Sequence, residues 1–189
     1  SSIVAYAFAI LRWPGRNLLF GILLATMMLP MQVTMIPVFV LFKQFGWLDT
    51  FKPLVVPAFL GGGAFNIFLL RQFYLGIPRE IADAARIDGC SEFRIYWNIM
   101  LPLARPALAT IAIMTFMFSW NDFLGPLIYL SEKDKSTLAL GLSMFVGQST
   151  SEWSLLMAAS ILMMIPMIAV FFFFQKNIIQ GFTMSGIKG

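Results

Sequence analysis

The sequence predicts an all-helical membrane protein that crosses the bilayer several times, and three observations support this prediction. Of its 189 residues, 59% are hydrophobic and 12% are charged, and its mean hydropathy is +0.83. A soluble domain has about one-quarter charged residues. The chain also contains long stretches with at most one charge. In addition, the chain has no His and only one cysteine, Cys90. This composition argues against a Ser-His-Asp triad, a His-ligated metal site and an intrachain disulfide.

We expect about five membrane helices, of which the first is incomplete. Residues 1–11 carry no charge, and Arg12 follows them. As a helix, this run covers roughly 16 Å of a hydrocarbon core about 30 Å thick. No basic region precedes it, as a cleavable signal peptide would require. We therefore expect the sequence to open partway through a membrane helix, with further chain upstream.

Four later stretches are each long enough to cross the bilayer, since about 20 apolar residues suffice. They are residues 18–42, 53–70, 106–131 and 153–175, and among them only 106–131 carries a charge, that of Asp122. Pro30, Pro37 and Pro166 lie inside these stretches. We expect the helices to continue through these prolines, because neighbouring helices in a membrane can satisfy the freed carbonyl groups.

The distribution of basic residues predicts the orientation. One set of alternate loops holds nine of them, and the other set holds four. The nine are Arg12, Arg16, Arg71, Arg79, Arg86, Arg94, Arg105, Lys176 and Lys188; the four are Lys43, Lys52, Lys133 and Lys135. Because basic loops stay in the cytoplasm, we expect the loop 71–105 and the C-terminus to be cytoplasmic.

Residues 78–102 predict two short helices that meet at a glycine. Pro78 can start the first helix, and Gly89 lies where a helix commonly ends in the left-handed conformation. Ser91 is a good cap for the second helix. On that helix, one face would carry Phe93, Tyr96, Trp97 and Met100. Periodicity leaves two alternatives for this face: contact with the membrane or its own bundle, and contact with a partner.

The spacing in this loop matches a known pattern. Asp83-Ala84-Ala85, three residues, Gly89, nine residues and then Ile99-Met100-Leu101-Pro102 resemble the EAA loop of binding-protein-dependent ABC importer permeases. The family pattern begins with Glu, whereas this chain has Asp83, whose side chain is shorter by one methylene group.

Other motifs narrow the resemblance over essentially the whole chain. They look like those of carbohydrate-uptake permeases similar to the maltose and glycerol-phosphate systems. The motifs are Ala5-Tyr6-Ala7-Phe8-Ala9 with Arg12-Trp13-Pro14-Gly15, then Ser119-Trp120-Asn121-Asp122-Phe123-Leu124, and Gln180-Gly181-Phe182-Thr183 followed by the ending Gly186-Ile187-Lys188-Gly189. The implied fold is a MetI-like type I ABC importer transmembrane domain over residues 1–189. Gly125 departs from relatives that often carry a bulky aromatic residue, so it either enlarges a local cavity or has no consequence.

The resemblance implies that residues 78–102 form the coupling loop, which docks on an ATP-hydrolysing subunit. The implied coupling residues are Glu80, Asp83, Ala84, Ala85, Asp88, Gly89, Phe93 and Pro102. The chain itself would bind no cofactor, since ATP and Mg would be held by the partner ATPase subunits. Indeed, Gly61-Gly62-Gly63 lacks the Lys of a nucleotide-binding loop. The implied partners are a second permease, two ABC ATPase subunits, an extracytoplasmic solute-binding protein and the lipid bilayer of a bacterial or archaeal cytoplasmic membrane, and no nucleic acid.

A substrate pathway is expected around Trp120, Asn121 and Asp122. A sugar offers apolar C–H surface to an aromatic ring and hydroxyls to an amide. Asp122 is either part of this pathway or the cap of a helix break before Gly125. Gln32 and Asn66 are weaker candidates, since lone amides more often join membrane helices.

Three rival functions are weighed against carbohydrate import. A permease of the same fold could carry another solute. An intramembrane hydrolase would need a second acid at membrane depth, but the other eight acids lie in loops. A homo-oligomeric channel would not need a coupling loop. We therefore predict an importer permease without enzymatic activity of its own.

Overall fold

The computed structural model of the protein describes residues 1–60, 62–143, 145 and 153–186. This part of the chain is helical and contains no strand, which confirms the predicted all-helical class. It forms two compact units: residues 1–34 with 57–111, and residues 35–56 with the chain from 112 onward. Gly61 of the glycine triplet and residues 187–189 of the C-terminal motif lie outside the described residues.

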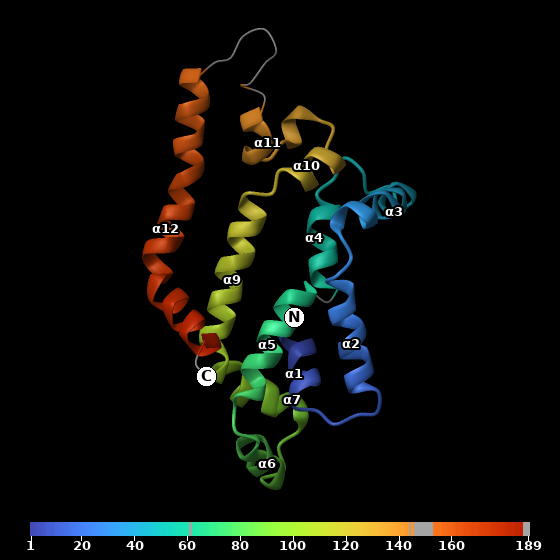
Figure 1. Ribbon diagram of the computed structural model, residues 1–189, viewed down its shortest axis with the longest axis vertical. Helices are drawn as coiled ribbons and strands as arrows, with labels where there is room; N and C mark the ends of the chain where they lie inside the picture. Colours follow the sequence, from blue (N-terminus) through green and yellow to red (C-terminus); the bar gives the residue numbers. More distant parts are fainter. Residues whose placement is uncertain (61, 144, 146–152, 187–189) are drawn as a thin grey trace. The chain divides into compact units, whose positions relative to one another are not determined.

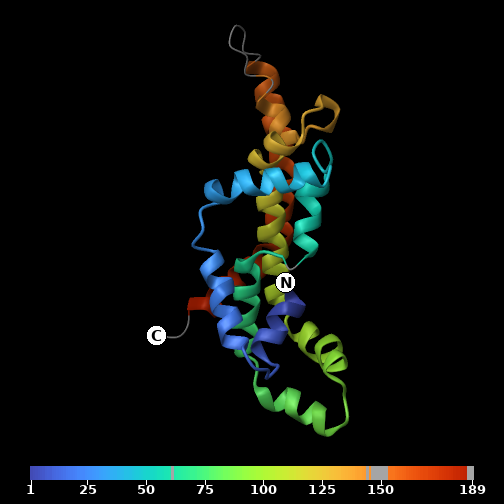
Figure 2. The ribbon, with the colours of Figure 1, turned by 90° about the vertical axis from the view of Figure 1, so that its right-hand side faces the viewer.

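The first unit is built around an N-terminal helix that packs against a later one. The helices α1 (Ser2–Ala9) and α2 (Arg16–Thr26) both contact α5 (Ala64–Leu75). Then follow α6 (Arg79–Ile87), α7 (Glu92–Ile95), the π-helix η1 (Tyr96–Met100), α8 (Leu101–Leu103) and the beginning of α9 (Arg105–Trp120). Leu70, Tyr74, Ile95 and Met100 are fully buried in its core. Figures 1 and 2 show α6 beyond the ends of α1, α2 and α5.

The second unit contains most of α3 (Met31–Gln44), the beginning of α4 (Lys52–Phe59) and the rest of α9. It continues through α10 (Leu124–Tyr129), the short 3₁₀ helix η2 (Lys133–Lys135), α11 (Leu138–Ser143) and α12 (Trp153–Gly186), and α11 contacts α12. Asp49 joins two of its loops. The Asp49 carboxylate accepts hydrogen bonds from the backbone N–H groups of Ser131 (3.0 Å) and Glu132 (3.1 Å) and from Lys135 Nζ (3.1 Å).

Helices that could span a membrane are present, as predicted. Within the described ranges, Lys52–Leu75 and Trp153–Phe174 are long and apolar enough to cross a bilayer, and the number rises from two to as many as four if each of two bent helix pairs is one span. The bent pairs are Arg16–Thr26 with Met31–Gln44, and Glu92–Leu103 with Arg105–Trp120.

Three of the expected spans are divided between helices. Residues 53–70 fall in α4, which ends at Phe59, and in α5, which begins at Ala64. Residues 18–42 are not one helix, because α2 ends at Thr26 and α3 begins directly after Pro30. A proline lacks an N–H and disfavours helical backbone in the residue before it, so the expectation that the helix continues through Pro30 is wrong. It holds at Pro37 and Pro166, which lie inside α3 and α12. Residues 106–131 are also divided, since α9 ends at Trp120 and α10 begins at Leu124.

Candidate functional site

The segment expected to be the coupling loop, residues 78–102 and called the coupling loop below, contains the predicted glycine elbow. α6 begins after Pro78 and ends at Ile87, and Gly89 has a φ of +79°. Only glycine adopts this left-handed conformation without a steric penalty from Cβ. A Cβ built at Gly89 would meet no other atom within 4 Å. The requirement for glycine therefore comes from the backbone conformation and not from lack of space.

The second helix of the coupling loop begins as predicted but then changes form. Ser91 Oγ accepts a hydrogen bond from Arg94 N (3.4 Å), which caps α7. After Ile95 the helix widens into η1. A π-helical turn holds more residues than an α-helical turn, so side chains after it face a different direction.

The predicted single face of four large side chains is therefore wrong. Tyr96 and Met100 are buried, with 5% and 0% of their surface exposed, whereas Phe93 and Trp97 are 71% and 57% exposed. The rings of Phe93 and Trp97 stack, with centroids 6.2 Å apart and planes 15° apart. The same helix thus anchors itself with Tyr96 and Met100 and presents a stacked aromatic pair to its surroundings.

A carboxylate at the start of α7 joins three elements. The Glu92 carboxylate accepts hydrogen bonds from Arg86 Nε (2.6 Å) and Arg86 Nη2 (3.2 Å) of α6, and from Tyr6 Oη (2.8 Å) of α1. Arg86 also pairs with Asp83. The hydrogen bonds from Arg86 lower the pKa of Glu92, and those to Glu92 raise the pKa of Arg86. Both groups are therefore held in their charged forms, and together they fix the loop to α1.

Three tyrosines lie behind this carboxylate. Tyr6, Tyr74 and Tyr96 are buried, and the ring of Tyr6 lies 6.1 Å from that of Tyr74 and 5.2 Å from that of Tyr96. Tyr96 Oη donates to Ser2 Oγ (3.0 Å), and Tyr74 Oη lies 2.9 Å from the same oxygen. Because buried hydroxyls require partners, this network holds α1, α5 and η1 in one arrangement.

Most of the predicted coupling residues are exposed, and two are wholly or partly buried. Glu80, Asp83, Ala84, Asp88, Gly89 and Phe93 are exposed, Pro102 is half-buried and Ala85 is buried. Arg86, Glu92 and Tyr6 were not among the predicted residues. The Asp83–Arg86 pair could have been found from its spacing of three residues on one helix. No local pattern indicates Tyr6, because Glu92 lies 86 positions away.

The predicted substrate-pathway residues are divided between the two units. Trp120, Asn121 and Asp122 belong to the second unit, and Gln32 and Asn66 belong to the first. At the break after α9, Trp120 Nε1 donates to Met163 O (3.0 Å) and Asn121 Nδ2 donates to Met117 O (2.8 Å). No group of three potential metal-binding side chains occurs within the described ranges.

Asp122 and Gly125 form a compact turn at this break. Asp122 Oδ1 accepts a hydrogen bond from Gly125 N (3.1 Å), which is the capping arrangement. Gly125 is buried, and a Cβ built there would collide with the Asp122 carboxylate and approach Leu54 Cδ2 to 3.0 Å. The small size of Gly125 therefore accommodates its neighbours, and the alternative of an enlarged cavity at this position is wrong.

Comparisons with known proteins agree with this arrangement. The family model described as "Binding-protein-dependent transport system inner membrane component" matches residues 1–184. The chain is 40% identical over its full length, and over 67% of the relative, to the arabinooligosaccharides transport system permease protein AraQ of Halalkalibacterium halodurans. It is 36% identical to the sn-glycerol-3-phosphate transport system permease protein UgpE of Yersinia enterocolitica, over 96% of the chain and 64% of the relative.

A solved structure has the same fold. It is the crystal structure of a bacterial ABC transporter involved in the import of the acidic polysaccharide alginate, with a TM-score of 0.82 and 29% identity over 93% of this chain and 66% of the other. The chain spans about two thirds of the length of these relatives. The match over residues 1–184 shows that the chain belongs to the family of binding-protein-dependent transport system inner membrane components.

Proposed function

We propose that the chain is the permease subunit of an ATP-driven importer for a carbohydrate or a related polyol. A solute-binding protein would deliver the substrate from outside, and a second permease would complete the path across the membrane. Family membership and the helices long enough to span a bilayer support this proposal. The matched relatives are named as permeases for arabinooligosaccharides and sn-glycerol 3-phosphate, which supports the substrate class.

In this proposal the coupling loop and the C-terminus face the cytoplasm. The distribution of nine against four basic residues supports that orientation. ATP hydrolysis takes place on two partner subunits, which bind ATP and Mg. Movement of these subunits reaches the membrane helices through the coupling loop, because Glu92 ties the loop to α1 and Tyr96 and Met100 anchor it in the core.

The observation that carries the proposal is the exposure of large apolar side chains on an otherwise anchored loop. Ile87 is 86% exposed, in addition to the stacked Phe93 and Trp97. Exposed apolar side chains at the end of a polar loop are typical of a protein-binding surface. Aromatic anchors of this kind fill a cleft on the partner, and in this chain the partner would be the ATPase subunit.

Replacing Phe93 tests whether the exposed aromatic pair binds the ATPase subunit. We expect Phe93→Ala to lower copurification of the ATPase subunit and substrate uptake by tenfold or more, since a buried interface anchor contributes about 2 kcal/mol or more. Phe51→Ala is the matched control, because Phe51 is an exposed aromatic residue outside the loop. Normal ATPase copurification and uptake in the Phe93 variant would contradict the proposal.

The substrate class needs its own measurement. In proteoliposomes containing the complete transporter and its binding protein, pentose oligosaccharides, maltose-type oligosaccharides and glycerol phosphate can be compared as stimulators of ATP hydrolysis. Stimulation by one of these classes supports carbohydrate import. Stimulation by an amino acid or a metal ion alone would assign the chain to the rival permeases of the same fold.

A further inference from the structure

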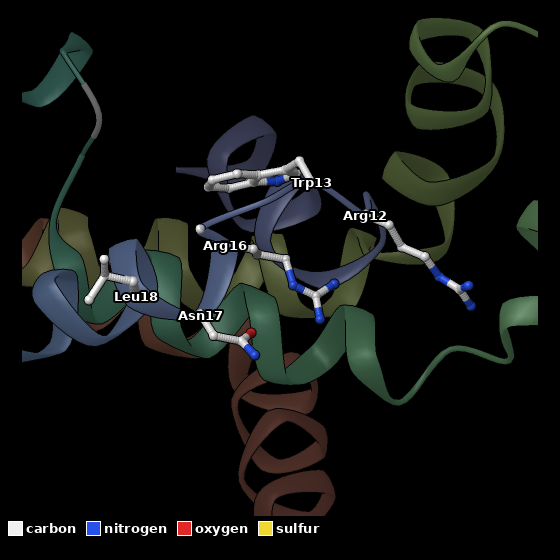
Figure 3. A pocket seen from close by; sticks show the side chains of 6 residues that line it. Arg12, Trp13, Arg16, Asn17 and Leu18 are labelled. Atoms are coloured by element: carbon white, nitrogen blue, oxygen red, sulfur yellow. The ribbon is translucent and has the colours of Figure 1, made fainter.

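A basic hollow lies at the loop between α1 and α2. It has a volume of about 260 Å³ and is lined by Arg12, Trp13, Gly15, Arg16, Asn17 and Leu18. Figure 3 shows Arg12 on this loop and Arg16 and Asn17 at the start of α2, with their side chains extending toward the same side of the view. A volume of about 10 to 15 Å³ on this measure is enough for one water molecule, so the hollow has room for one phosphate group and part of its hydration shell.

The arginines around this hollow lack acidic partners. In the described ranges the ion pairs involve Arg86 and Lys135, and none involves Arg12, Arg16 or Arg71. Arg71 lies 3.9 Å from the centre of the Phe20 ring, donates to Phe8 O (3.3 Å) and is close enough to Arg16 for their charges to repel. Like charges gathered without a carboxylate attract an anion, and the guanidinium fork matches phosphate oxygens.

Exposed apolar residues continue from the hollow along α2. Leu18 lines the hollow and is itself exposed, and Leu19 beside it and Ile22 one turn later are also exposed. Leu18 and Ile22 are four positions apart and therefore share one face of the helix. Trp13 adds an amphipathic ring of the kind that lies at membrane interfaces, held by its hydrogen bond to Ala7 O (3.2 Å).

We propose that this hollow binds the phosphate of an anionic phospholipid, whose acyl chains lie along Leu18 and Ile22. A soluble phosphate would use the guanidinium groups but not the adjoining apolar face. A zwitterionic lipid would use the apolar face, but its own cation would be repelled by the arginines. An anionic lipid would use both the arginines and the apolar face. Basic sites at the cytoplasmic side of membrane helices bind anionic lipid head groups in this way. The proposal does not depend on the transported solute.

Native mass spectrometry of the detergent-solubilised protein, with its bound subunits, tests this site. The probe is dioleoyl phosphatidylglycerol, and dioleoyl phosphatidylcholine is the zwitterionic comparison without net charge. We expect the protein to retain phosphatidylglycerol in preference, and we expect Arg12→Gln and Arg16→Gln each to raise its dissociation constant about fivefold. Arg79→Gln is the matched control, since Arg79 is exposed and lies outside the hollow.

Replacing Arg12 as well as Arg16 separates loss of lipid binding from a local folding defect. Arg16 also donates to Leu11 O (3.0 Å), so its replacement removes an internal hydrogen bond, whereas the Arg12 side chain makes no hydrogen bond or ion pair within the described ranges. Equal dissociation constants in the Arg12, Arg16 and Arg79 variants would overturn the proposal. Equal retention of the two lipids would also overturn it, and displacement of phosphatidylglycerol by inorganic phosphate would assign the site to a soluble anion instead.

Discussion

Tyr6 and Glu92 are 86 positions apart in the chain, and the Tyr6 hydroxyl donates a 2.8 Å hydrogen bond to the Glu92 carboxylate. This bond joins the first helix to the coupling loop. Since Arg86 also donates hydrogen bonds to this carboxylate, Glu92 is the point where α1, α6 and α7 meet. In the proposed function, a change in the position of the loop would pass directly to α1 through this carboxylate.

Removing the Tyr6 hydroxyl should weaken this connection. We expect Tyr6→Phe to lower the free energy of unfolding by about 1 to 2 kcal/mol, because a hydrogen bond to a charged group is lost at a buried site. Substrate-stimulated ATP hydrolysis should fall more than basal hydrolysis. Tyr129→Phe is the control, since no hydrogen bond of its hydroxyl occurs in the described residues. Additive effects of Tyr6→Phe and Glu92→Gln in a double-mutant cycle would show that the two residues are not coupled.

The glycine elbow can be tested by adding a side chain. Gly89→Val forces a branched residue into a left-handed conformation, which costs on the order of 1 kcal/mol or more. We expect the protein to insert into the membrane but to bind the ATPase subunit less tightly. Gly21→Val is the control, because Gly21 lies in α2 without a positive φ and has open space around it. Normal uptake and copurification in the Gly89 variant would contradict the role of the elbow.

Cys90 reports the orientation, because it is the only thiol of the chain and lies next to Gly89. A membrane-impermeant maleimide should label it in inverted vesicles but not in intact cells. In a Cys90→Ser background, Ser131→Cys should show the opposite pattern, since residue 131 is exposed in a loop expected outside. Labelling of Cys90 in intact cells would reverse the proposed topology.

Two variants of Asp122 can distinguish a role in capping the turn before Gly125 from a role in binding substrate. Because Asn caps as well as Asp, Asp122→Asn should preserve stability, whereas Asp122→Ala should lower the free energy of unfolding by about 0.5 to 2 kcal/mol. Thermal unfolding measures this difference. If Asp122→Asn keeps stability but reduces uptake, the carboxylate contacts substrate. Unchanged uptake in Asn121→Ala and Trp120→Ala as well would place the pathway elsewhere.

The loop connection through Asp49 should depend on pH. Hydrogen bonds from Ser131 N, Glu132 N and Lys135 hold the pKa of Asp49 well below its usual value. A carboxylate with a lowered folded-state pKa stabilises the fold above its unfolded-state pKa of about 3.9 and loses this contribution as the pH falls further. The melting temperature of the wild type should therefore exceed that of Asp49→Asn at pH 7, and the difference should shrink below about pH 4. A difference that does not change with pH would contradict this account.

Local signals predicted some parts of the coupling loop correctly. Gly89 and Ser91 act within a few residues of their own positions, so their types indicate the elbow and the cap. The hydrogen bond between Tyr6 and Glu92 could not be predicted in this way, because it depends on how α1 packs against the loop. Likewise, an uncharged stretch indicates the presence of a span but not its course, so the break before Pro30 was missed even though the proline is visible in the sequence.

The wide turn at Tyr96–Met100 has a consequence for insertions and deletions in this segment. The nine residues that separate Gly89 from Ile99 include most of this turn. A π-helical turn holds about one residue more than an α-helical turn. Deleting one residue within this turn would therefore let a regular α-helix form in which Phe93 and Trp97 face nearly as they do now relative to Met100. The wide turn thus allows the segment to lose one residue without a large change in the direction of the aromatic pair.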